Sequence, residues 1–179
     1  MIHRFRFVLA CVVTLVLGGQ AHGQPLLPEQ VFTFGTEVNE SINDVAMTES
    51  GDVFAVGTKD GPGQPDLLIL KYRRDGTLAF AKIYAFGVDC TGRSIEVMGD
   101  GGIVVSAYIA TRFVDALTMR LDSLGNVIWA NTWGSGDWDP GNGLAIDASG
   151  NVYQNVASLG LGSIDNVQVK YDGAGSLIH

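Results

Sequence analysis

Residues 133–153, WGSGDWDPGNGLAIDASGNVY, contain the pattern on which the rest of the chain is built. The turn segment SGNVY at 149–153 recurs in related form as SGDVF at 50–54 and DGGIV at 100–104. The spacing is about 50 residues each time, which is typical of propellers and other repeat arrays. The pattern therefore predicts tandem repeats at about 35–86, 87–133 and 134–179.

Each repeat contains short apolar runs separated by Gly-containing turns. The third run is the clearest, because DLLILKY (66–72) aligns without gaps with DALTMRL (115–121) and DNVQVKY (165–171). One face of each run is apolar throughout, an alternation that predicts a half-buried antiparallel strand. Gly supplies the positive φ that tight turns need, so we expect two hairpins in each repeat. They are expected at 49–52, 99–102 and 148–151, and again at 74–77, 123–126 and 174–176.

The fold class follows from these strands. The chain's 24 glycines lie among short apolar runs, and no useful helical periodicity follows the first 23 residues, so an all-β fold is predicted. Four antiparallel strands per unit, packed unit on unit, predict β-propeller blades, whereas a β-sandwich would not explain the repeat. Closed rings use about 4–8 blades, and the third repeat stops in mid-strand. We therefore expect an open or incomplete propeller whose free strand edges recruit further repeats or another copy of the chain.

The N-terminus has the layout of a secretory signal peptide over residues 1–23. Arg4 and Arg6 precede an apolar run, and small residues precede Gln24. The run is shorter than the ~20 residues of a membrane-spanning helix, so stable membrane insertion is not expected. Residues 24–29 contain two prolines and predict a mobile lead into a repeat domain at 30–179, which opens with a strand at 31–34. The expected location is secreted, extracellular or at the cell surface, with the periplasm as an alternative.

Composition excludes several functions. Removal of the leader leaves 9 of the 11 basic residues against 19 acidic ones, a balance that repels phosphate backbones and makes nucleic acid an unexpected partner. Cys90 is the one cysteine after the leader, so it cannot form an intrachain disulfide; a buried thiol is expected, with pairing between chains as the alternative. His179 is the one remaining histidine, which excludes paired-His zinc sites and His-based triads. These absences argue against an enzyme.

The segments WGSGD (133–137) and GLAIDASGNVY (143–153) resemble the bacterial β-propeller repeat family of secreted and cell-surface proteins. The first repeat lacks the leading Gly-Ser-Gly, and the second has Asp-Gly-Gly in place of Ser-Gly-Asn. The resemblance implies a fold and an exported location, and it assigns no catalytic residue. Residues 122–129 (DSLGNVIW) also resemble the spacing of quinoprotein propeller repeats, but this is the one copy with the Trp, so a shared hairpin is the expected meaning.

Two sets of carboxylates recur. The first follows the aromatic-Gly boundary of each repeat and comprises Glu37, Asp89, Asp137 and Asp139. Propeller loops of this kind gather on one face, where carboxylate oxygens could bind Ca²⁺; the competing interpretation is a soluble, turn-capping surface. The second set starts the third strand of each repeat and comprises Asp66, Asp115 and Asp165. Its recurrence indicates a structural role, in which each carboxylate accepts N–H bonds from the preceding loop.

A basic residue also recurs on the third strand, as Lys71, Arg120 and Lys170. This row could bind an anionic glycan, but a solvated strand face is the simpler interpretation. We expect an exported, non-catalytic propeller segment that serves as a scaffold or as a recognition surface for a protein or glycan. The alternative is a fragment of a propeller enzyme, either a quinoprotein dehydrogenase or a glycan-active hydrolase or lyase. Calcium is the one cofactor that the sequence suggests.

Overall fold

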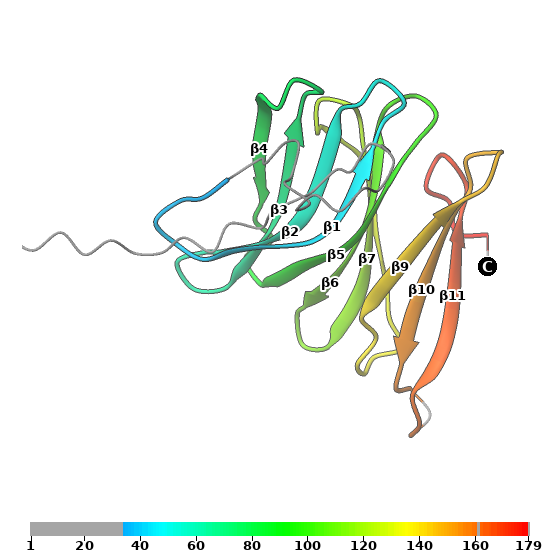
Figure 1. Cartoon of the computed structure of the whole chain (residues 1–179). Helices are drawn as coiled ribbons and strands as arrows, with labels where there is room; N and C mark the ends of the chain where they lie inside the picture. The colour runs from blue at the N-terminus through cyan, green and yellow to red at the C-terminus, as the bar shows by residue number, and fades with distance from the viewer. Residues whose placement is uncertain (1–33, 161, 179) are drawn as a thin grey trace, which may run out of the picture.

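The computed structural model describes residues 34–160 and 162–178, whose regular structure consists of β-strands in three antiparallel sheets (Figure 1). The all-β prediction is confirmed for this part of the chain. The predicted leader at 1–23, the lead at 24–29, most of the strand expected at 31–34, and His179 lie outside the described residues. Among the described residues, no helix has the length and apolar character to cross a membrane.

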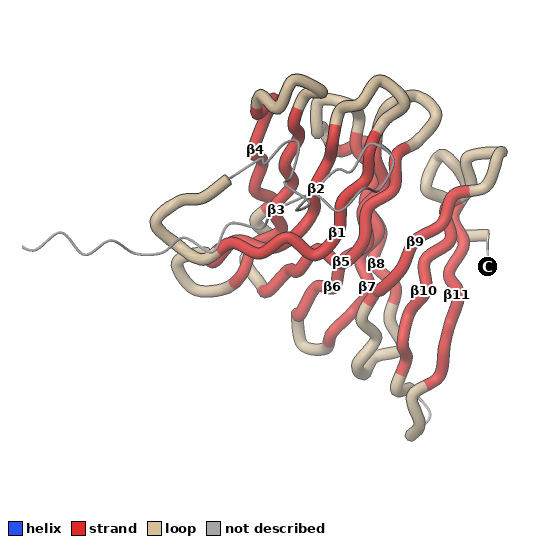
Figure 2. Tube along the Cα trace, in the orientation of Figure 1, coloured by secondary structure: helices blue, strands red, loops and turns tan. Residues whose placement is uncertain are grey.

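Each sheet is an up-and-down meander in which neighbours in sequence are neighbours in the sheet (Figure 2). The first sheet contains β1 (Glu40–Met47), β2 (Val53–Asp60), β3 (Pro65–Tyr72) and β4 (Leu78–Tyr84). The second contains β5 (Asp89–Val97), β6 (Ile103–Ala110), β7 (Val114–Leu121) and β8 (Val127–Trp133). The third contains β9 (Gly141–Ile146), β10 (Val152–Ser158) and β11 (Asp165–Tyr171). The sheets are therefore propeller-type blades in an open stack, and within residues 34–160 and 162–178 the third sheet has three full strands.

The hairpins lie where the Gly signals predicted them. In the second hairpins, the Gly125 N–H donates to the Asp122 carbonyl and the Gly175 N–H donates to the Asp172 carbonyl, both at 3.0 Å. Both glycines have positive φ, 76° and 90°, which residues with a Cβ rarely adopt. The Asp122 carboxylate also accepts the N–H groups of Leu124 and Asn126 at 2.8 Å each. Local side-chain and backbone chemistry therefore fixes these turns.

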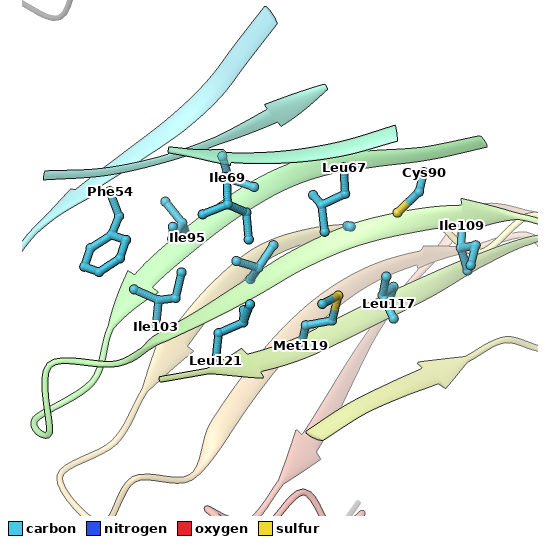
Figure 3. Close-up of a cluster of buried hydrophobic side chains, with 13 residues drawn as sticks. Phe54, Leu67, Ile69, Cys90, Ile95, Ile103, Ile109, Leu117, Met119 and Leu121 are labelled. Carbon is cyan, nitrogen blue, oxygen red and sulfur yellow. The ribbon is translucent and has the colours of Figure 1, made fainter. Parts of the chain in front are cut away.

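An apolar core fills the space between the first two sheets. Figure 3 shows Phe54, Leu67 and Ile69 from the first sheet pointing toward Ile103 and Leu121 from the second. All five are fully buried, and each such side chain contributes about 1.5–3 kcal/mol on leaving water. The buried thiol expected of Cys90 is confirmed in the same core, where burial and the charge of Asp66 raise its pKa to about 12.

The expectation of half-buried third strands was wrong for β3. Leu67 and Ile69 lie on the face that was expected to meet solvent, and the second sheet covers them. The opposite face carries a second apolar cluster, in which Leu68 and Leu70 pack with Phe34 and others. Both sides of β3 are therefore buried, one by the second sheet and the other in the cluster with Phe34 and Ile42, and the alternation in its sequence does not mark a solvent-exposed side.

Candidate functional site

The loop before the third sheet is organised by Asp139, which was predicted as a metal ligand. Its carboxylate is fully buried and accepts hydrogen bonds from the Ser135 N–H at 2.6 Å and the Ser135 hydroxyl at 2.8 Å. Its own N–H donates to the Val114 carbonyl at 2.6 Å. Burial raises the pKa of Asp139, but hydrogen bonds from Ser158 and Ser135 outweigh that effect and hold the pKa below its ordinary value. Asp139 therefore anchors this loop.

Asp115, at the start of β7, lies close to this anchor. A Cβ added to Gly134 would come within 2.0 Å of the Asp115 carboxylate, so this glycine leaves space for the side chain. Burial, and then the charge of Asp139, raise the pKa of Asp115. Two carboxylates with pKa values shifted in opposite directions are an arrangement that general acid–base chemistry can use.

The remaining predicted calcium ligands are separately placed. Glu37 and Asp137 are exposed loop residues, and Asp89 is the exposed first residue of β5, paired with Ala110. Within residues 34–160 and 162–178, no group of three or more His, Cys, Asp or Glu side chains could hold a metal ion. Calcium binding by these loops stays a prediction for titration.

The other two third-strand aspartates contact neighbouring loop residues. The Asp66 carboxylate lies beside Gly61, where an added Cβ would approach it to 2.8 Å. The Asp165 carboxylate accepts a hydrogen bond from the Ser163 hydroxyl at 3.4 Å. The structural role expected for Asp66, Asp115 and Asp165, as acceptors of loop N–H groups, stays a prediction.

The basic row connects successive sheets. The Lys71 ammonium donates to the Ser123 carbonyl of the second sheet at 3.2 Å and pairs with Asp52 at 3.2 Å. Arg120 donates in the same way to the Gly173 carbonyl of the third sheet at 3.4 Å, at the equivalent hairpin position, and pairs with Asp100. The interpretation as a solvated row was wrong for these two side chains, which are only 14% and 13% exposed.

Fourth-strand residues contact the same hairpins. The Tyr84 hydroxyl donates to the Gly125 carbonyl at 2.5 Å, and the Asn131 amide donates to the Gly175 carbonyl at 2.7 Å. Phe80 and Trp129, at matched positions in β4 and β8, lie against these glycines. Together with the basic row, these contacts form a repeated hairpin clamp: the third and fourth strands of one sheet hold the second hairpin of the next sheet. The sequence prediction missed this clamp.

The interface between the second and third sheets contains buried polar side chains. The Gln154 carboxamide donates to the Ser106 hydroxyl at 2.8 Å and to the Leu117 carbonyl at 3.1 Å, and it accepts from the Thr118 hydroxyl at 2.7 Å. Gln154, Ser106 and Thr118 are all fully buried. This interface therefore combines an apolar cluster, which includes Val104, Val156 and Val169, with hydrogen bonds between fully buried side chains.

The face of the third sheet that points away from the second, here called the outward face, is polar. Beside Ala145 of β9, it carries three directly opposed pairs from β10 and β11: Tyr153 with Lys170, Asn155 with Gln168, and Ala157 with Asn166. Asn155, Gln168 and Asn166 are exposed, and Tyr153 and Lys170 are half-buried. The aligned positions of the first sheet are apolar and fully buried, namely Phe54, Val56, Leu67 and Ile69. A comparison of the three aligned repeats could have revealed this difference from the sequence.

The edge of β11 that faces away from β10 pairs, at the C-terminal end of the strand, with residues 177 and 178. Leu177 bridges Tyr171, and the Ile178 N–H donates to the Lys170 carbonyl at 2.8 Å. In contrast, β3 pairs with β4 from Leu67 to Tyr72, and β7 pairs with β8 in the same way. An edge strand of this kind can accept another strand.

Comparison with known proteins adds information about the fold. Neither the family models nor the curated proteins give a match. A crystal structure of a protein of unknown function from Bacteroides caccae matches with a TM-score of 0.53 and 16% identity, over 85% of this chain and 49% of that one. A protein described as a candidate gluconolactonase matches with a TM-score of 0.45 and 17% identity, over 83% of this chain and 50% of that one. The chain thus spans about half the length of each, and the first likeness concerns the fold alone.

Proposed function

We propose that this chain is an exported, non-catalytic propeller segment whose outward face recognises a protein or a glycan. The observation that carries the proposal is the difference between the faces of the sheets. Polar side chains between the sheets, such as Gln154 and Arg120, hold the stack together, whereas Asn155 and Gln168 are exposed and directly opposed on two paired strands. The resemblance to secreted and cell-surface repeat proteins supports the exported location.

Binding of the purified protein to envelopes from the producing cells tests this proposal. A Gln168→Arg substitution, which fills the outward face with a long charged side chain, is expected to abolish binding. Asn39→Arg, at an exposed amide of the first repeat, should leave binding unchanged. Equal binding by both variants would contradict recognition through the outward face. Protease treatment and periodate oxidation of the envelopes then separate a protein partner from a glycan.

A fragment of a propeller enzyme is the second candidate. The observation in its favour is that two carboxylates lie at adjacent loop residues, Asp115 beside Gly134 and Asp139 bonded to Ser135. A hydrolytic activity that is lost in Asp115→Asn while the fold persists would support it. Either function is compatible with strand addition at the outer edge of β11, where further repeats or a second copy of the chain could pair.

A further inference from the structure

We infer that the outward face of the third sheet binds a neutral, hydroxyl-rich oligosaccharide. The inference rests on the proposed recognition function and names its ligand. The three opposed pairs place the carboxamides of Asn155, Asn166 and Gln168 on one face of two adjacent strands. Opposed side chains have Cβ atoms about 4.5–5.5 Å apart. Carboxamides both donate and accept hydrogen bonds, as sugar hydroxyls do.

The repeated hairpin clamp gives a second reason to expect an oxygen-bearing ligand. Lys71 and Arg120 each donate to a carbonyl oxygen of the next sheet's hairpin, at 3.2 Å and 3.4 Å. Lys170 occupies the same strand position, and its ammonium lies 4.8 Å from the centre of the Tyr153 ring. An oxygen atom of a ligand would therefore take the place that a hairpin carbonyl takes in the first two repeats.

Other occupants fit the outward face less well. The faces that receive a following sheet are lined by fully buried residues such as Val56 and Ile69, or by Ser106 and Thr118, which share one glutamine. Packing a further sheet or a protein core onto three carboxamides would bury polar groups that each need a matched partner. The net charge of −8 opposes a polyanion. A neutral glycan avoids both costs.

Calorimetric titration of the purified protein with soluble neutral polysaccharides tests the inference. The panel should contain glucose, galactose, mannose and xylose backbones, with polygalacturonate as the acidic comparison. We expect binding to at least one neutral polysaccharide and a loss of at least tenfold in affinity in the Asn155→Ala/Gln168→Ala double variant. Asn39→Ala is the matched control and should bind like the parent protein. Because the substituted positions are exposed, unfolding midpoints of all variants should agree.

Three results would overturn the inference: binding of polygalacturonate alone, no binding to any neutral member of the panel, or an equal loss in the control variant. Failure of this inference can be told apart from failure of the proposed recognition function. Envelope binding that is lost in Gln168→Arg, resists periodate and is removed by protease would keep the recognition function and exclude the glycan.

Discussion

The carboxamide oxygen of Gln154, in the third sheet, accepts a hydrogen bond from the hydroxyl of Thr118, in the second, at 2.7 Å, and neither side chain reaches solvent. Gln154→Ala removes this acceptor and also the amide that donates to the buried Ser106 hydroxyl and to the Leu117 carbonyl. We expect the free energy of unfolding to fall by about 2–4 kcal/mol. Urea unfolding measures the change. Gln154→Leu combined with Thr118→Val replaces both partners by apolar groups and should recover much of the loss; a strictly additive double variant would contradict the coupling.

Because of the hairpin clamp, substitutions at the basic third-strand residues should lower the free energy of unfolding by different amounts. Lys71→Met removes a partly shielded ion pair with Asp52 and the bond to the Ser123 carbonyl, and should lower the free energy of unfolding by about 1 kcal/mol. Lys170→Met is the matched comparison and should change it by less than about 0.5 kcal/mol. Urea unfolding midpoints of the Lys71→Met and Lys170→Met variants, measured in low and high salt, compare these two costs. Equal effects would show that the inter-sheet contact of Lys71 adds no stability.

Gly175 is expected to tolerate alanine less well than Gly101. Both have positive φ, 90° and 79°, so alanine strains the backbone at either position. At Gly175 an added Cβ would also lie 2.8 Å from the Trp129 ring, whereas at Gly101 it would meet nothing within 4 Å. Gly175→Ala should therefore destabilise by at least about 1 kcal/mol more than Gly101→Ala in thermal unfolding. Equal losses of stability would mean that the Trp129 ring can shift to make room for the added methyl group.

The lowered pKa of Asp147 predicts how the free energy of unfolding depends on pH. Hydrogen bonds from the Asn151 side chain and backbone, and then from Ser149 and Tyr153, lower its pKa to about 2. Because the folded pKa lies below the unfolded value of about 3.9, its contribution is present above pH 4 and is lost as pH falls toward 2. In Asp147→Asn the urea midpoint should fall less steeply over this range. An unchanged slope would show that other carboxylates dominate.

Calcium binding by the loop carboxylates can be measured directly. Titration of chelator-treated protein with millimolar Ca²⁺ should release heat that disappears when Asp89 and Asp137 are both replaced by Asn. Asp122→Asn, at a hairpin carboxylate outside this set, is the control and should bind as before. The site would be discarded if the parent protein gave no heat.

The sequence predicted those features that depend on local chemistry. The turns at Gly125 and Gly175 follow from the positive φ that glycine permits and from an aspartate three residues earlier that caps the turn. The meander follows because short strands joined by such turns pair with their neighbours. Repetition at about 50 residues then indicated blades instead of a sandwich.

The inter-sheet contacts could not be predicted in the same way. The Asp44 carboxylate accepts hydrogen bonds from the Ser94 hydroxyl and the Ile95 N–H, which are 50 and 51 residues away. Such contacts depend on how the sheets stack, and no local pattern specifies that. Asp139 illustrates the same limit, because a loop carboxylate that anchors Ser135 has the same sequence appearance as one that binds a metal.

The two interfaces between sheets differ in how they would respond to a pulling force. Water can replace the hydrogen bonds that Gln154 makes across the second interface, but it cannot replace the aliphatic contacts of Leu67 and Ile69 across the first. If the chain is stretched between its ends, the third sheet should therefore detach as a unit before the first two separate. The buried hydrogen bonds of Gln154 at the second interface would give this protein a direction of mechanical failure, from its C-terminal end inward.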